Sequence, residues 1–144
     1  MSAPGRRLAV DYGRRRIGLA VCDPLGITTR ALPSLLSTTL DEDLATIAGH
    51  CRAEEVEGLV IGVPIRLDGG EGRAASEVRL FAAVLRERLK LEVDEVDERL
   101  TTKGAHALLK EAGHRHAQRR PRLDGTAAML ILRTWLERRK RSLA

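Results

Sequence analysis

Acidic residues stand at the ends of several predicted secondary-structure elements. Asp11 ends the first apolar run of the chain. Asp97 and Glu98 end a later run, and Asp124 precedes a long helical pattern. Because functional sites in α/β sheets gather at the carboxyl ends of strands, these acids can meet in one place. Each also has a local explanation: Asp11 can shape the Asp-Tyr-Gly turn, Glu98 can pair with Arg99, and Asp124 can cap a helix.

The chemistry expected of such acids is metal binding. Carboxylates that converge without a basic partner repel one another unless cations lie between them. Oxygen ligands select hard cations such as Mg²⁺ or Mn²⁺, and two such ions about 3.5–4 Å apart stabilise in-line displacement at a phosphodiester. The chain contains no Walker A loop, GxGxxG, HExxH or GxSxG motif, which would indicate other chemistries.

Apolar patterns in the first half predict the elements that position Asp11. Strands are expected over 8–11 and 17–22, paired as a hairpin. A weaker strand over 30–36 contains Pro33, which predicts a sheet edge or a bulge. Residues 39–42 (TLDE) fit a capping box that begins a helix, and residues 58–63 form an apolar, central strand.

The second half alternates helices with one strand. An amphipathic helix is expected over 74–89, a strand over 91–96, and a helix from Thr101 or Thr102 to about Ala112. A basic loop over 113–121 precedes a last helix over 123–139, in which Trp135 faces the core. The order β-β-β-α-β-α-β-α-α predicts an α/β fold with a five-stranded mixed sheet and helices on both faces.

Length and composition bound the class of protein. The 144 residues, 43% hydrophobic and 31% charged, are typical of one globular domain, taken as 1–144. No apolar run approaches the roughly 18 residues of a membrane helix, and the first residues lack the apolar core of a signal peptide. The two cysteines match no metal or disulfide pattern, which favours a cytoplasmic location.

The positive charge is concentrated in one region. Residues 113–144 hold nine Lys or Arg and two acids, a net charge of +7. The rest of the chain holds 16 Lys or Arg and 18 acids, a net charge of −2. Such a region is typical of a polyanion partner, although a solvated basic face is the alternative. Since aromatic residues are only 2% of the chain, nucleic acid would be recognised through phosphates and shape. His114 and His116 are expected to face phosphates, with metal binding as the alternative.

Four ordered blocks resemble the signatures of the YqgF/RuvX family. They are residues 11–23 (DYGRRRIGLAVCD), 61–69 (IGVPIRLDG), 97–102 (DERLTT) followed by Ala105, and 123–128 (LDGTAA) followed by Ile131 and Leu132. Members of that family are RNase H-like proteins described as Holliday junction resolvases and as nucleases for pre-16S rRNA. The blocks extend over nearly the whole chain, so the resemblance implies an RNase H-like fold and a divalent-metal nuclease site.

The resemblance also implies roles for individual residues. Asp11, Glu98 and Asp124 match the acidic triad that holds the metal and performs catalysis, with Mg²⁺ or Mn²⁺ as cofactor. Glu98 is favoured over Asp97 by the family pattern, and alternation along a strand would place the two on opposite faces. We expect the nucleic-acid backbone to be held by a set of arginines: Arg14, Arg15, Arg16, Arg66, Arg73, Arg115, Arg119, Arg120 and Arg122.

Several alternatives remain at this level. The substrate is either the 5′ end of pre-16S rRNA, which we favour, or a Holliday junction, whose two symmetric cuts would require a homodimer. A non-catalytic RNA-binding assembly factor and an ATP-dependent phosphotransferase are weaker alternatives. The chain departs from the family pattern at Cys22, where serine is common, and at Arg66, where asparagine is common and where a cation can change the grip on phosphate.

Overall fold

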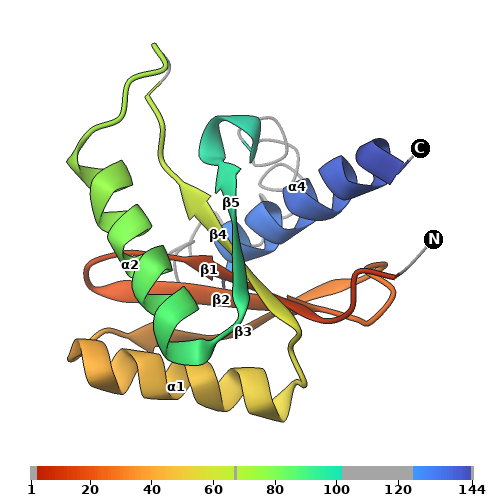
Figure 1. Cartoon of the computed structure of the whole chain (residues 1–144), viewed down its shortest axis with the longest axis horizontal. Helices are drawn as coiled ribbons and strands as arrows, with labels where there is room; N and C mark the ends of the chain where they lie inside the picture. The colour runs from red at the N-terminus through yellow and green to blue at the C-terminus, as the bar shows by residue number, and fades with distance from the viewer. Residues whose placement is uncertain (1–2, 67, 102–124, 144) are drawn as a thin grey trace, which may run out of the picture.

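The computed structural model describes residues 3–66, 68–101 and 125–143 (Figure 1). Its elements are, in chain order, β1 (Arg7–Asp11), β2 (Arg16–Cys22), β3 (Thr29–Leu36), α1 (Leu40–Ala53), β4 (Gly58–Val63), α2 (Arg73–Leu89), β5 (Glu92–Asp97), the 3₁₀ helix η1 (Glu98–Thr101) and α4 (Thr126–Leu143). The third predicted helix, the basic loop 113–121 and the first two residues of the predicted last helix lie outside the described residues.

The five strands form one mixed sheet in the order β3-β2-β1-β4-β5. The strands β1 and β2 pair antiparallel as the predicted hairpin, whereas β4 is parallel to both β1 and β5. Because parallel strands point the same way, β1, β4 and β5 end together at Asp11, Val63 and Asp97. We call this place the carboxyl end of the sheet.

Helices cover both faces of the sheet, which confirms the predicted fold class (Figure 1). On one face, Leu8 and Val10 pack with apolar side chains of α1 and α2. On the other face, Ala9 and Ala20 pack with Ile131 and other residues of α4. Since the face of the sheet beneath α4 carries small side chains, this helix can approach the strands closely.

Local signals in the sequence set the boundaries of several elements correctly. The Thr39 hydroxyl accepts a hydrogen bond from the Glu42 amide at 3.2 Å and caps α1 as predicted. The second half of the capping box differs, because the Glu42 carboxylate accepts from the Thr38 hydroxyl at 2.7 Å. The strand β3 lies at the sheet edge, with exposed Pro33 beside a register shift that faces residues 17–19.

The last helix differs from the prediction at both ends. It begins at Thr126 rather than at residue 123, because Gly125 has a φ of 69° and cannot lie within a right-handed helix. It continues to Leu143, past the predicted end at Arg139. Trp135 is half-buried rather than a core residue, because its indole Nε1 donates to the Asp94 carboxylate at 2.9 Å. None of the helices in the described ranges is long and apolar enough to cross a membrane.

Replacing Gly125 with alanine should destabilise the fold. A Cβ at this position would lie 2.9 Å from the Leu19 carbonyl oxygen and 3.0 Å from the Ala31 Cβ, in a backbone conformation that alanine avoids. We expect Gly125→Ala to cost roughly 2–3 kcal/mol of the free energy of unfolding, measured by urea denaturation.

The control is Gly49→Ala, inside α1, where an added Cβ meets only the tip of the Arg52 side chain at 4.0 Å. That change should stabilise the protein by up to about 1 kcal/mol. Equal effects of the two substitutions would contradict the placement of the α4 start.

Candidate active site

Asp11 is the last residue of β1 and lies beside the first turn of α4. It pairs in the sheet with Gly18 of β2. A Cβ on Gly18 would lie 3.4 Å from the Asp11 Cβ, 3.7 Å from its Oδ2 and 3.8 Å from the Ala128 Cβ. The missing side chain at Gly18 therefore leaves room for the carboxylate next to α4. Burial in this position raises the pKa of Asp11.

Glu98 lies on the same face, one residue beyond the end of β5. A Cβ on Gly62 of β4 would lie 3.0 Å from the Glu98 Cγ and 2.6 Å from the Ile131 Cδ1. The side chain of Glu98 is thus held between the end of the sheet and α4. Its pKa is raised to about 7, first by burial and then by the negative charges of Asp11 and Asp97. The influence of Asp11 on this pKa places the two carboxylates in one electrostatic environment.

Asp97 is engaged differently from its neighbour. Its carboxylate accepts from the Arg99 guanidinium, with Nη2 at 2.7 Å and Nε at 3.0 Å, and from the Arg99 amide at 2.9 Å. These bonds lower the pKa of Asp97. The two acids are separated by a turn, because β5 ends at Asp97 and Glu98 begins η1. The separation of Asp97 from Glu98 therefore does not come from strand alternation, which the sequence had suggested. Arg99 binds Asp97.

The third acid of the predicted triad, Asp124, lies outside the described residues. The described chain resumes at Gly125, which packs against Leu19 and Ala31, and α4 begins at the next residue. Among the residues the structure describes, no group of three His, Cys, Asp or Glu side chains could hold a metal ion. The site as described therefore consists of two carboxylates, Asp11 and Glu98.

Two of the predicted backbone-binding arginines meet near Asp11. Arg14 and Arg73 both line a pocket of about 440 Å³ together with Tyr12 and Pro64. Arg14 also forms an ion pair with Glu77 of α2, with Nη2 and Oε1 2.8 Å apart. The pocket includes Tyr12, the residue after Asp11, so it lies at the same end of β1 as that carboxylate but on the α2 face.

The other predicted arginines are less closely gathered. Arg66 pairs with Asp68 at 3.5 Å in the loop after β4. Arg15 is exposed and Arg16 is half-buried at the start of β2. The remaining residues singled out in the basic loop lie in the part of the chain that the structure does not describe: His114, Arg115, His116, Arg119, Arg120 and Arg122.

The spacing residues at the site were not predicted from the sequence. Gly18 and Gly62 interrupt apolar strands, and a glycine inside a strand is a known signal of close approach by another group. The two glycines therefore indicated close approach by some group, but the sequence did not show which side chains approach them. Arg99 forms an ion pair with Asp97, whereas the sequence had suggested that it can pair with Glu98.

The donors at the site fit a hard divalent cation. Two carboxylates that are both removed from water raise each other's cost of ionisation. A cation between them would offset that cost, and carboxylate oxygen is the ligand that Mg²⁺ and Mn²⁺ prefer. The arrangement can therefore hold a metal near a phosphate-sized anion bound by the neighbouring arginines.

Comparisons with known proteins agree on one family. The family model described as RuvX, Holliday junction resolvase, matches residues 5–138. A relative from Koribacter versatilis (strain Ellin345), named "Putative pre-16S rRNA nuclease", is 42% identical over 94% of this chain and 88% of its own length. A relative from Picosynechococcus sp. with the same name is 40% identical over 95% of both chains.

A solved structure shares the fold. RuvC of T. thermophilus, in complex with a Holliday junction substrate, superposes with a TM-score of 0.65 over 96% of this chain and 97% of its own. The sequence identity is 13%, so this likeness concerns the fold alone.

The raised pKa of Glu98 predicts a pH-dependent stability in the absence of metal. Because the folded-state pKa of about 7 lies above the ordinary value of 4.5, the folded protein holds this proton more tightly than the unfolded chain does. The resulting stability is present below pH 4.5 and is lost as the pH rises through about 7. We expect a loss on the order of 1–2 kcal/mol, allowing for the partial exposure of the site.

The measurement is urea denaturation in EDTA between roughly pH 5 and pH 8, comparing wild type with Glu98→Gln. The variant should lack this component of the pH dependence. Glu87→Gln, at an exposed glutamate that pairs with Lys90, serves as the control and should behave as wild type. Identical pH profiles for wild type and Glu98→Gln would contradict the proposed environment of Glu98.

Proposed function

The chain belongs to the RuvX family, and we propose on that basis that it is a divalent-metal-dependent nuclease acting on structured nucleic acid. It is a hydrolase that cleaves phosphodiester bonds, with one nuclease domain over residues 1–144. The observation that carries the proposal is the pair of half-buried carboxylates, Asp11 and Glu98, at the carboxyl end of the sheet. Burial raises the pKa of both acids, and the charge of Asp11 raises the pKa of Glu98 further, which is typical of a functional site.

We assign metal binding to Asp11, Glu98 and Asp124, with Mg²⁺ or Mn²⁺ as the cofactor. When bound, the metal would supply an activated water and neutralise charge on the leaving oxygen. The protein's own part is positional: β1 and η1 fix two carboxylates, and α4 packs over Gly62 to restrict water on one side. Asp124 lies two residues before Thr126, where α4 begins, which fits a third ligand from the start of that helix.

The arginines next to the site have the role of holding the phosphate backbone. Arg14 and Arg73 line one pocket beside Asp11, and Arg66 lies in the adjoining loop. A guanidinium presents paired donors that suit phosphate oxygens. Arg14 must exchange its contact with Glu77 for a phosphate when nucleic acid binds, a change that an exposed ion pair permits at little cost.

We propose the 5′ end of pre-16S rRNA as the substrate. Support comes from the names of the relatives that match most of the chain at about 40% identity. The scarcity of aromatic side chains also fits recognition through backbone and shape rather than base stacking. Processing of this RNA would take place in the cytoplasm, in agreement with two free, buried cysteines.

Resolution of Holliday junctions is the second candidate. The description of the matching family model and the junction-bound RuvC of the same fold favour it. Two symmetric cuts would require two active sites and therefore a C2 dimer. The third candidate is a non-catalytic RNA-binding factor, which would bind RNA without turnover. The absence of any cleavage would favour this candidate.

The first prediction from this proposal concerns catalysis. Purified protein with Mn²⁺ or Mg²⁺ should cleave an RNA carrying the 16S 5′ leader, and EDTA should abolish cleavage. Asp11→Asn removes one ligand charge and should lower the rate by more than about 100-fold, since even residues that only support metal ligands contribute 10–100-fold. RNA binding by this variant should remain.

Asp41→Asn is the matched control, because Asp41 is an exposed carboxylate on α1 that pairs with Arg88, away from the site. It should cleave as wild type does. Paired nicks in a four-way DNA junction, without cutting of the leader RNA, would replace rRNA processing with junction resolution. Full activity of Asp11→Asn would reject the site itself.

The second prediction concerns metal binding without turnover. A metal that binds only the folded state increases the free energy of unfolding, by about 2.7 kcal/mol at a concentration 100 times its dissociation constant. The melting temperature rises as a result. Mn²⁺ should therefore stabilise wild type and Asp41→Asn, and should stabilise Asp11→Asn and Glu98→Gln much less. Equal stabilisation of all four proteins in a thermal melt would show that the metal binds elsewhere.

A further inference from the structure

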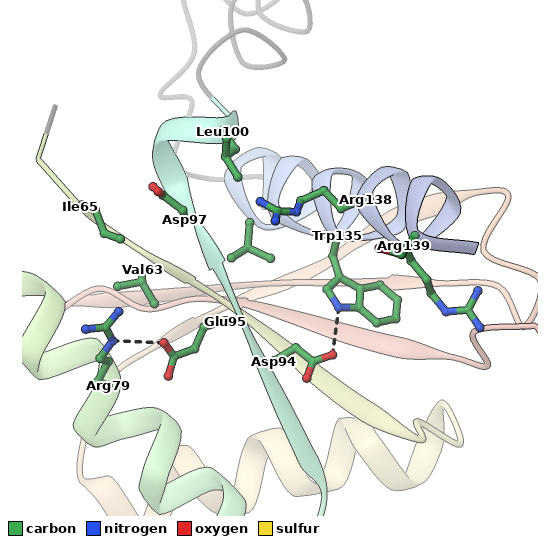
Figure 2. A pocket seen from close by; sticks show the side chains of 12 residues that line it. Val63, Ile65, Arg79, Asp94, Glu95, Asp97, Leu100, Trp135, Arg138 and Arg139 are labelled. Atoms are coloured by element: carbon green, nitrogen blue, oxygen red, sulfur yellow. Dashed lines mark hydrogen bonds and ion pairs between the residues drawn. The ribbon is translucent and has the colours of Figure 1, made fainter. Parts of the chain in front are cut away.

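A second groove shares no lining residue with the pocket that Arg14 and Arg73 line, which we call the arginine pocket. It has a volume of about 660 Å³ and runs along β5 beneath α4 (Figure 2). Its lining includes Val63 at the end of β4, Asp97 and Leu100 near the end of β5, and Trp135 and Arg138 on α4. We call it the β5–α4 groove.

The groove adjoins the candidate active site through residues next to Glu98 in the chain. Asp97 and Leu100, which line it, flank Glu98 in the chain, and Val63 pairs with Asp97 in the sheet. A strand of nucleic acid whose phosphate lies at Asp11 and Glu98 therefore has a path into the groove. The arginine pocket lies on the α2 side of the same strand ends, so the two surfaces extend from the site in different directions.

The carboxylates that line the groove already have partners. Asp94 accepts from the Trp135 indole at 2.9 Å, and Glu95 accepts from Arg79 at 3.1 Å (Figure 2). Asp97 accepts from Arg99, as described above. The charges of Glu95 and Asp97 are therefore offset by arginines, whereas Asp94 keeps its charge and has only the neutral indole as its donor.

Arg138 is an exposed cation of the groove whose charge adds to the larger effect of Arg99 in lowering the pKa of Asp97. It takes part in none of the ion pairs found between described residues. Figure 2 shows its side chain extending from α4 toward Leu100 and Asp97, at the end of the groove nearest Glu98. Arg139 of the same helix also lines the groove and adds to the positive potential there.

The lining also includes apolar side chains. Leu100 is 48% exposed although it lies close in the chain to Glu98, whereas Val63 is buried in the core. A cationic wall facing an apolar surface suits a sugar-phosphate backbone with an unstacked base. Pockets of roughly 300–1,000 Å³ hold ligands of small-molecule size, so the groove suits a short single strand and not a duplex.

We propose that the β5–α4 groove binds the single-stranded nucleic acid that flanks the scissile phosphate, with Arg138 contacting a backbone phosphate. The inference rests on the proposed function, because it names the path of that enzyme's substrate. Arg138 is a positioning residue in this scheme, since it holds the strand and does not touch the reacting bond. A β-strand of a protein partner along the free side of β5 is the competing occupant.

The test measures binding in an Asp11→Asn background, so that cleavage does not interfere. The probes are a fluorescein-labelled RNA hairpin with a short single-stranded tail and the same hairpin without the tail, followed by fluorescence anisotropy over a range of salt. Arg138→Gln should weaken binding of the tailed RNA about fivefold and lower the slope of log K against log salt by about 0.7, as expected for one lost contact to a single strand. Binding of the untailed hairpin should change less than about twofold.

Two variants control for charge and folding. Arg133→Gln removes the same charge from the same helix, but Arg133 lines a different pocket, beside Ile27 and Thr29; its tailed and untailed affinities should change equally and slightly. Arg138→Lys keeps the charge and should restore most of the affinity for the tailed RNA. Thermal melts of each variant show whether the fold is retained.

Different outcomes separate the two proposals. If Arg138→Gln leaves tailed-RNA binding and its salt slope unchanged, or weakens both probes equally, the groove does not hold the strand and a protein partner becomes the better candidate. If wild type cleaves nothing with Mn²⁺ or Mg²⁺ while the tail-dependent loss is found, the nuclease proposal fails and the groove remains a nucleic-acid site.

Discussion

Helix α4 packs on a sheet face whose side chains are unusually small, and the carboxyl end of the sheet depends on that contact. Ala9 and Ala20 lie beneath the helix, and Gly62 leaves space for Ile131 and for Glu98 at once. A Cβ on Gly62 would meet both side chains within 3.0 Å. Close packing of the helix therefore buries Glu98 directly and confines Asp11 beside Gly18, and this burial raises the pKa of each acid.

The burial of like charges is unfavourable in a protein without a cation. Stability alone would favour an acid that is exposed or paired with a cation. Asp97, one residue before Glu98, is such an acid, because Arg99 binds it and lowers its pKa. The two neighbouring carboxylates thus have opposite electrostatic environments within one turn. Asp97 fixes the end of β5 through Arg99, whereas the environment of Glu98 suits the metal-binding role that we propose for it.

The positive charge of the described surface is arranged on both sides of these acids. Arg14 and Arg73 line a pocket toward α2, and Arg138 lines the groove toward α4. Several other arginines are held in ion pairs, for example Arg79 with Glu95. An extended polyanion could therefore contact the protein on each side of the acids, which is the geometry needed to hold a phosphodiester in the middle.

The sequence alone determined the features that depend on near neighbours. Apolar alternation identified the strands, Thr39 began α1, and Pro33 placed β3 at the edge, because each signal acts within a few residues. The four ordered motifs likewise identified the family. What only the tertiary structure decided was which side chains meet across the sheet. The spacing at Gly62 and the position of Arg138 depend on contacts whose geometry appears only when distant segments pack together. The pairing of Asp97 with Arg99 is local, but it depends on the turn from β5 into η1.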